Sequence, residues 1–231
     1  MIEFNNKTKF CIICENELPA TAEYFHKNEK GVCGLDNRCR KCRRQHNINQ
    51  KLEVITHYGG RCAVCGEATT AFLTMDHINN DGLKHIGSER RHLYYYLINN
   101  YFPPGFQVLC WNHNWLKQIE FIRQDLSYSN HAIRQRRHNL KLKTEVIICY
   151  GGKCQCCKEI NLDLLSVDHI EGNGLKHRVK IGGSQYFYSN LKIENFPSGY
   201  QVLCLNCNCG KHINGGVCPH KSLVLQESNY V

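Results

Sequence analysis

One pattern occurs twice in the sequence, and this internal repeat constrains the fold more than any other feature. Residues 54–62 (VITHYGGRC) align with residues 146–154 (VIICYGGKC), and the same offset places Asp-His-Ile 76–78 over Asp-His-Ile 168–170. A later Gln-Val-Leu-Cys segment also occurs in both copies, after a middle loop that is two residues longer in the second. The repeat indicates that one small structural unit forms twice in the same chain.

The repeat divides the 231-residue chain into four predicted parts. An N-terminal module (1–45) precedes the first copy (46–122). A basic connector (123–138) then leads to the second copy with its C-terminal tail (139–231). The length suits one or two ordinary domains.

Each copy predicts a helix ended by Gly-Gly, two short apolar strands and a further helix directly after the second strand. The expected helix and two strands are 51–57, 72–75 and 107–110 in the first copy, and 143–149, 164–167 and 201–204 in the second. The aromatic-rich segments 94–98 and 186–188 are more typical of core packing than of base stacking. The predicted fold class is therefore α+β, built from small modules.

Sixteen cysteines, most of them in C-x-x-C pairs, predict metal binding. The N-terminus lacks the apolar run of a signal peptide, which favours a reducing, cytoplasmic location over a disulfide scaffold. Buried reduced thiols would not explain a spacing that recurs six times. Three structural zinc sites are expected, with these ligands: Cys11, Cys14, Cys39 and Cys42; Cys62, Cys65, Cys110 and His113; Cys154, Cys157, Cys204 and Cys207.

The remaining cysteines carry weaker signals. Cys209, His212, Cys218 and His220 are candidates for a fourth metal site, although the first copy has no counterpart for them. Cys149 and Cys156 are expected to be small apolar packing residues.

The chemistry-bearing residues lie between and just after the cysteine pairs. Zinc with four protein ligands is closed, so a reaction would need other groups. Asp and Asn oxygens suit Mg²⁺, and a neutral His can take a proton from water. Neighbouring strand residues point to opposite faces, so a bend would be needed to bring Asp and His to one site.

The order C-x-x-C, Asp-His-Ile, Leu-Cys-x-x-Cys/His-Asn-x-x-Lys resembles the HNH endonucleases of the His-Me finger (ββα-metal) superfamily, especially phage forms. The resemblance implies two tandem units behind a module similar to a zinc ribbon, and a bend between Asp and His. It implies that His77 and His169 are general bases, and that Asp76 with Asn114, and Asp168 with Asn208, hold a catalytic Mg²⁺ or similar ion. The family's middle Asn has no convincing match, because Asn190 aligns with Tyr96, and Asn100 and Asn195 are out of register.

A formal charge of +9 favours a polyanionic partner. A solvated helix face is the usual interpretation of a charge run, but basic runs precede both copies. The residues predicted to contact DNA are Arg40, Arg43, Arg44, Arg134, Arg136, Arg137, Lys117, Lys211, His85 and His177. For the last four, an ordinary surface role is about as consistent with the sequence.

Together these features predict an endonuclease that cuts double-stranded DNA, in which the repeats act as an internal pseudo-dimer within a monomer. Restriction, homing and phage DNA processing are the roles that such an enzyme could serve. If the enzyme is phage-encoded, it would act inside a host cell. One alternative is a nickase with a single active unit. Another is a non-catalytic zinc protein that binds DNA, which leaves the doubled Asp-His and Asn unexplained. No segment has the apolar length of a membrane span, so no membrane partner is expected.

Overall fold

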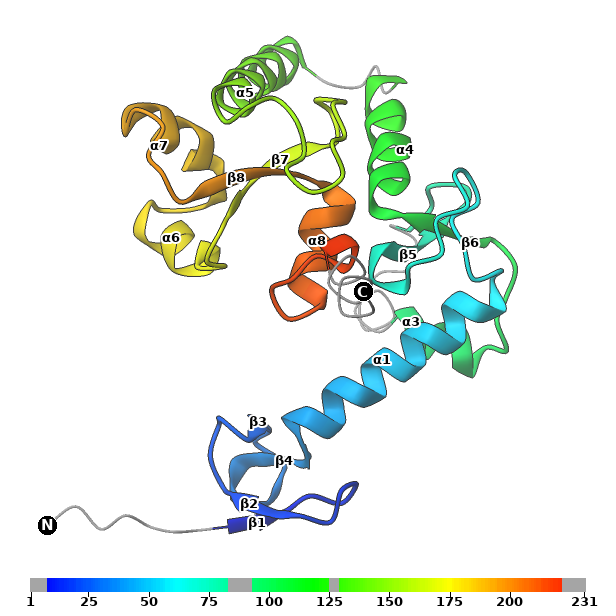
Figure 1. Cartoon of the computed structure of the whole chain (residues 1–231). Helices are drawn as coiled ribbons and strands as arrows, with labels where there is room; N and C mark the ends of the chain where they lie inside the picture. The colour runs from blue at the N-terminus through cyan, green and yellow to red at the C-terminus, as the bar shows by residue number, and fades with distance from the viewer. Residues whose placement is uncertain (1–7, 83–92, 125–128, 222–231) are drawn as a thin grey trace, which may run out of the picture. The chain divides into compact units, whose positions relative to one another are not determined.

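The computed structural model describes residues 8–82, 93–124 and 129–221 (Figure 1). The chain divides into two compact units, each made of two segments. The first contains Met1–His57 and Lys84–Pro104, and the second contains Tyr58–Leu83 and Gly105–Val231. The fold is α+β with four two-stranded sheets among the described residues, which confirms the predicted class.

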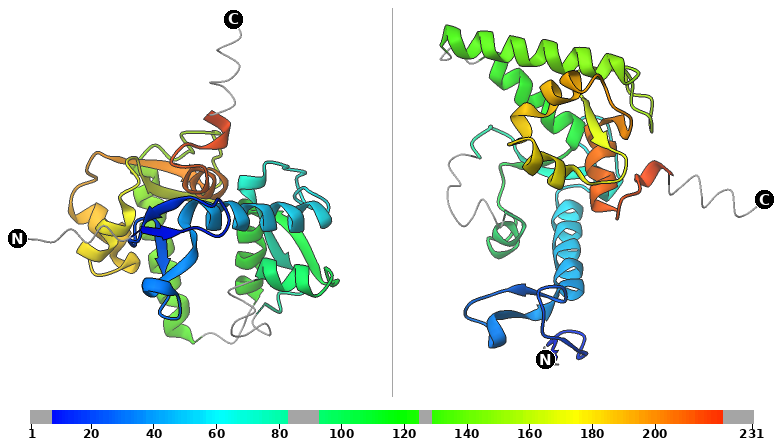
Figure 2. Two further views of the ribbon diagram at one scale, coloured as in Figure 1. Left: turned by 90° about the horizontal axis from the view of Figure 1, so that it is seen from below. Right: turned by 90° about the vertical axis from the view of Figure 1, so that its left-hand side faces the viewer.

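The first unit begins with two small antiparallel sheets. Strand β1 (Thr8–Phe10) pairs with β2 (Glu17–Pro19), and β3 (Phe25–Lys27) pairs with β4 (Leu35–Cys39) after the short helix η1 (Val32–Gly34). Helix α1 (Arg40–His57) continues directly from β4, as both views in Figure 2 show. It packs against α3 (Leu93–Asn99) in the same unit.

The second unit contains two hairpins of the same design. Strand β5 (Leu73–His77), which follows η2 (Thr70–Phe72), pairs with β6 (Phe106–Cys110) and leads into α4 (Trp111–Gln124). Strand β7 (Leu165–His169) pairs with β8 (Tyr200–Cys204) and leads into α8 (Leu205–Ile213). The predicted order of strand, strand and helix is confirmed in both copies.

The register is also the same in the two hairpins. The Asp of each Asp-His pair lies opposite the Gln of the Gln-Val-Leu-Cys segment: Asp76 faces Gln107, and Asp168 faces Gln201. Both ladders continue without a shift through the His. The bend expected between Asp and His is therefore not present in either strand.

The second hairpin carries three further helices and a short 3-10 turn. They are α5 (Asn130–Cys149), α6 (Gly174–Lys180), η3 (Ser184–Tyr186) and α7 (Phe187–Ile193). Phe72 of the first copy is fully buried among core residues of the second, including Val146, Leu165 and Leu191. Phe72 of the first copy thus belongs to the core of the second.

The predicted boundaries at 45/46 and 138/139 fall inside α1 and α5, helices of 18 and 20 residues. The predicted connector (123–138) is therefore mostly helix where it is described, because a basic run supports a solvated helix face as readily as a linker. No helix among the described residues is both long and apolar enough to cross a bilayer.

Candidate metal centres and active site

Four groups of cysteine and histidine side chains bring their ligand atoms within 4.8 Å of one another in the described residues. Three are the predicted sets: the N-terminal four cysteines, the first-copy set with His113, and the second-copy set of four cysteines. Each group can hold a metal ion. The sequence prediction of these three ligand sets is confirmed at that level.

The fourth group differs from the prediction. It contains Cys156, Cys207, Cys218 and His220, and it shares Cys207 with the second-copy set. The predicted ligands Cys209 and His212 are not part of it. On α8 at 100° per residue, Cys209 lies about 200° around the helix from Cys207, so it points away. Cys156 packs against the core of the second copy, as expected, and also belongs to this group.

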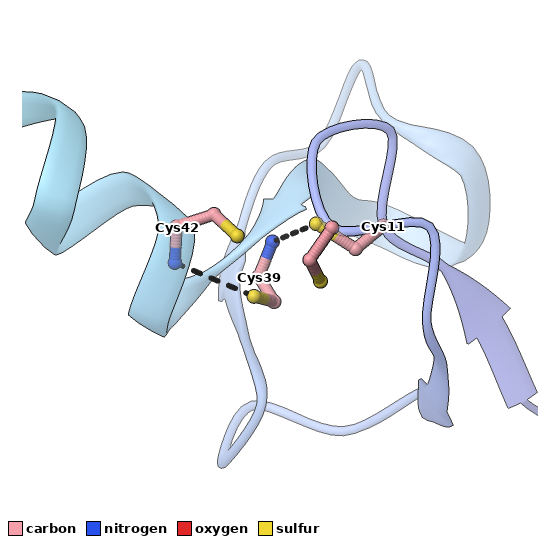
Figure 3. A group of neighbouring side chains, drawn as sticks. Cys11, Cys39 and Cys42 are labelled. Carbon is pink, nitrogen blue, oxygen red and sulfur yellow. Dashed lines mark hydrogen bonds between the residues drawn. The ribbon is translucent and has the colours of Figure 1, made fainter.

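The N-terminal group shows how the backbone prepares such a site (Figure 3). The amide of Cys39 donates to Cys11 Sγ at 3.3 Å, and the amide of Cys42 donates to Cys39 Sγ at 3.4 Å. Burial opposes ionisation of Cys11, but backbone hydrogen bonds outweigh it and lower its pKa to about 6. Burial and the neighbouring thiols raise the pKa of Cys42 to about 12. The group thus favours a thiolate among crowded thiols, an arrangement that a divalent cation would stabilise.

The spacing in the repeats suits zinc as well. Ligands about 2.3 Å from a tetrahedral ion lie about 3.8 Å apart. Cys157 Sγ and Cys204 Sγ are 3.6 Å apart, and Cys62 Sγ is 3.7 Å from His113 Nδ1. Hydrogen bonding with Cys204 and Cys207 lowers the pKa of Cys154 well below its usual range.

The carboxylate of each Asp-His pair lies on the hairpin face that its following helix covers. Lys211 Nζ of α8 is 2.7 Å from Asp168 Oδ2, and Gln201 Nε2 donates to the same oxygen at 2.9 Å. In the first copy, Lys117 and Gln107 contact Asp76 in the same way, at 2.5 and 2.8 Å. The predicted phosphate-contacting lysines are therefore ion-pair partners of the aspartates.

The predicted metal-binding asparagine shares this face in the second copy. Asn208 Nδ2 donates to Ser166 Oγ at 3.0 Å, and Ser166 lies two residues before Asp168 on β7. Residues two apart on a strand point to the same side, so Ser166 and Asp168 share one face of the hairpin. Asn208, which contacts Ser166, therefore lies on the same face as Asp168. In the first copy, Asn114 precedes Lys117 by one turn of α4, which puts both on one helix face.

The histidine points to the other face, toward α6 and α7. His169 Nε2 is 2.9 Å from His177 Nδ1, and His177 Nε2 is 3.1 Å from Asn190 Oδ1. An amide oxygen only accepts, so His177 donates through Nε2 and accepts through Nδ1 from His169. In this series of hydrogen bonds Nε2 of His169 carries the proton, so Nδ1 of His169 is the nitrogen with the lone pair.

The environment of His169 favours its neutral form. Burial lowers the pKa of His169, and His177 lowers it further, while Asp168 acts in the opposite direction. The ring also stacks against Phe187 and contacts Tyr200, with centroids 5.3 and 4.8 Å away. A neutral, fixed imidazole is the form that can accept a proton.

Glycines keep space beside this nitrogen in both copies. A Cβ on Gly174 would lie 3.1 Å from His169 Nδ1, and a Cβ on Gly82 would lie 3.1 Å from His77 Nδ1. Both glycines follow the Asp-His pair at the same distance in the sequence. The repeated contact indicates that access to Nδ1 is a shared feature of the two copies.

A pocket of about 440 Å³ opens on His169. Its lining includes His177, Lys176, Lys180 and the backbone turn at Gly199. Two ammonium groups outnumber the one carboxylate in the lining, that of Glu171, so the pocket has the net positive charge and hydrogen-bonding groups that suit an anionic phosphodiester.

The other predicted DNA contacts divide into two sets. Arg40 Nε donates to Ala22 O at 2.8 Å and Arg43 pairs with Asp36, so both stabilise the N-terminal module. Arg134, Arg136 and Arg137 are exposed on α5, Arg44 is exposed on α1, and His85 lies outside the described residues.

Sequence reasoning missed several residues of the site. The alignment pairs Asn190 with Tyr96 and so predicts no role for it, although His177 lies between Asn190 and His169. Gln107 and Gln201 are predicted only as strand residues, yet their recurrence opposite each Asp was a usable signal.

Comparisons of the chain with protein-family models, with curated proteins and with solved structures found no match.

Proposed function

We propose that this protein is a divalent-metal-dependent endonuclease that hydrolyses phosphodiester bonds in double-stranded DNA, with two zinc-stabilised HNH-like units in one chain. The observation that carries the proposal is the second-copy site, where a neutral His169 with an available Nδ1 borders a basic pocket. Structural zinc with four ligands leaves the chemistry to these other groups.

His169 supplies the general base in this proposal. Its Nδ1 accepts a proton from the attacking water, while Nε2 stays hydrogen-bonded to His177. Asn190 holds His177 in the tautomer that this requires. Lys176 and Lys180 attract the phosphate, and the exposed arginines of α5 neutralise neighbouring phosphates without reading sequence.

Asp168 and Asn208 would hold the catalytic divalent ion, because their oxygens are hard ligands on the same hairpin face. His169 points to the other face, so joint action of the ion and the base on one phosphate requires the bend between Asp and His that the resemblance implies. A bound Mg²⁺ would stabilise negative charge that develops on the phosphate and the leaving oxygen. Lys211 now neutralises Asp168, so its ammonium must yield that carboxylate to the ion. It is then free to contact phosphate, as the sequence predicted.

The contact between the repeats supports paired action. The amide of Asn112 donates to Asn206 Oδ1 at 3.0 Å, and the amide of Asn206 donates to Asn112 Oδ1 at 2.9 Å. These residues are equivalent in the two copies. Reciprocal contacts between equivalent residues are the mark of a two-fold axis, here within one chain. Such symmetry matches the two antiparallel strands of a duplex.

A nickase is the second candidate, and one difference between the copies favours it. Asn190 supports His177 in the second copy, whereas Tyr96 stands at that position in the first. The second copy of the repeat alone would then cut efficiently.

Cleavage of supercoiled plasmid in Mg²⁺ tests both candidates. The double-strand enzyme is expected to give linear product, with nicked circles from His77→Ala and from His169→Ala and no cutting by the double variant. The nickase instead gives only nicked circles, unaffected by His77→Ala and abolished by His169→Ala. His138→Ala, at an exposed position of α5, is the matched control. Absence of cutting by the zinc-loaded wild type in Mg²⁺, Mn²⁺, Co²⁺ and Ni²⁺ would overturn the proposal.

A further inference from the structure

The second copy contains more metal-binding side chains than one zinc ion needs. Its predicted set, Cys154, Cys157, Cys204 and Cys207, shares the thiol of Cys207 with the group formed by Cys156, Cys218 and His220. Two groups of four that share one member comprise seven side chains. Cys207 is fully buried at the point where the groups meet.

The distances in the additional group fit a tetrahedral ion. Nδ1 of His220 lies 3.4 Å from Cys207 Sγ, 3.8 Å from Cys218 Sγ and 3.9 Å from Cys156 Sγ. Zinc with one nitrogen at about 2.0 Å and sulfurs at about 2.3 Å requires separations of about 3.5 to 3.8 Å. The three distances from nitrogen to sulfur are close to this range, and all four ligand atoms lie within 4.8 Å of one another.

We propose that the second copy holds a dinuclear zinc centre in which the thiolate of Cys207 bridges the two ions. One ion takes Cys154, Cys157 and Cys204 in addition to the bridge. The other takes Cys156, Cys218 and His220. Each of the cysteines releases its proton on binding, and His220 binds through Nδ1 as a neutral ring.

The charge balance is favourable for the second ion. A zinc ion with four thiolates carries a net charge of −2. Adding a second Zn²⁺ with two further thiolates and a neutral imidazole leaves that net charge unchanged, because the bridge is shared. The centre therefore buries a second ion without adding net charge to the core.

The bridge also accounts for a difference between the repeats. Position 207 is Cys, whereas its counterpart is His113, which ligates through one ring nitrogen and cannot place the same atom on two ions. Cys156 likewise corresponds to Val64, an exposed residue that cannot bind metal. The first copy thus has the residues for one ion and the second has them for two.

The second ion would connect three separate segments. Cys156 lies inside the first cysteine pair, Cys207 lies on α8, and Cys218 and His220 follow α8. The ring of His220 packs against Phe72 of the first copy, with centroids 4.7 Å apart. A Cβ on Gly210 would lie 2.4 Å from Phe72, so α8 and the His220 segment together form the surface that receives Phe72. The dinuclear centre therefore stabilises the contact between the repeats.

Metal content of the full chain tests the number of ions. Plasma mass spectrometry is expected to find four zinc ions per wild-type chain, one for each group. Cys156→Val, which introduces the residue of the first copy, and Cys218→Ser are each expected to lower the count to three. Cys33→Ser and Cys209→Ser are the matched controls and should retain four. A wild-type count of three, or a Cys156→Val variant that retains four, would overturn the proposal.

The bridge needs its own measurement. In protein loaded with ¹¹³Cd, two ions joined by one thiolate are expected to show scalar coupling between two cadmium resonances, and Cys156→Val should remove both the coupling and one resonance. Because Val occurs at this position in the first copy, this variant is expected to fold. Four cadmium resonances without any cadmium–cadmium coupling would show separate ions and overturn the bridge.

Discussion

At the scale of single residues, the site depends on which nitrogen of His169 is available. The hydrogen-bond chain through His177 to Asn190 occupies Nε2, and Gly174 leaves space beside Nδ1. Both conditions come from residues outside the Asp-His pair. The proposed general base is thus defined by its neighbours as much as by its own identity.

Replacing Gly174 by Ala should slow cleavage by the second copy, because the added methyl group crowds Nδ1 of His169. In a His77→Ala background, which isolates this unit, the single-turnover nicking rate is expected to fall at least about tenfold, since a general base contributes about 10²-fold or more. Leu175→Ala, at the next and exposed position of α6, is the control. An unchanged rate for Gly174→Ala would show that the nitrogen needs no such space.

Lys211 should compete with the catalytic ion for Asp168. Lys211→Met keeps the apolar stem but removes the ammonium that lies 2.7 Å from the carboxylate. A partly exposed ion pair contributes on the order of 1 kcal/mol, so the Mg²⁺ concentration for half-maximal cleavage is expected to fall severalfold. Lys192→Ala, which breaks a pair with Glu145, is the control. A higher Mg²⁺ requirement in Lys211→Met would mean that Lys211 supports the ion instead of opposing it.

At the scale of elements, helices α4 and α8 stabilise each other's first turns. Asn112 and Asn206 are the second residues of their helices, where backbone amides have no partner within the helix. Each side chain accepts from the other helix's amide. Trp115 of α4 adds a bond from Nε1 to Asp163 O at 3.0 Å, and Arg123 pairs with the Asp163 carboxylate. The helix that completes one metal group is therefore capped by the other copy.

Asn112→Ala and Asn206→Ala should each destabilise the zinc-loaded protein by about 1 kcal/mol, because each leaves one helix amide without its acceptor. The two bonds use different atoms, so the double variant should lose about twice as much. Denaturant unfolding of the four proteins measures both values, with Asn139→Ala on the exposed face of α5 as control. A double variant no less stable than either single variant would mean that the two bonds form only together.

At the scale of the whole molecule, candidate metal ligands make up a large share of the buried core in the described residues. In the N-terminal module the buried apolar cluster is Cys11, Phe25, Leu35 and Cys39, and two of these four belong to the candidate metal group. In the second unit the main cluster includes Cys154, Cys204, Cys207 and Cys218. Small modules with so few apolar residues depend on metal for stability.

Removing zinc should therefore unfold the protein instead of only inactivating it. Structural zinc contributes on the order of 10 kcal/mol to small zinc modules, which exceeds what the four-residue core of the N-terminal module can supply. A strong chelator is expected to release zinc together with helical circular dichroism and protection from proteases, and added zinc should restore both. A chelated protein that keeps its helical signal and protease resistance would contradict this dependence.

The sequence by itself determined the repeat, three metal-ligand sets and the order of strand, strand and helix. These features follow from local spacing: C-x-x-C places two thiols on one turn, and short apolar runs between turn residues form strands. The Asp, His and Asn candidates were named from the same pattern. The directions of their side chains were not predicted correctly, because the expected bend between Asp and His is absent.

Only the tertiary structure decided which distant groups meet. Cys156, Cys207 and His220 come together because the knuckle, α8 and the following segment pack on one core, and no local spacing encodes that packing. For the same reason Asn190 is linked to His169 through His177, and Asn112 caps the helix that begins near Asn206. Local pattern specifies ligands within a turn, whereas contacts across dozens of residues depend on how the elements pack.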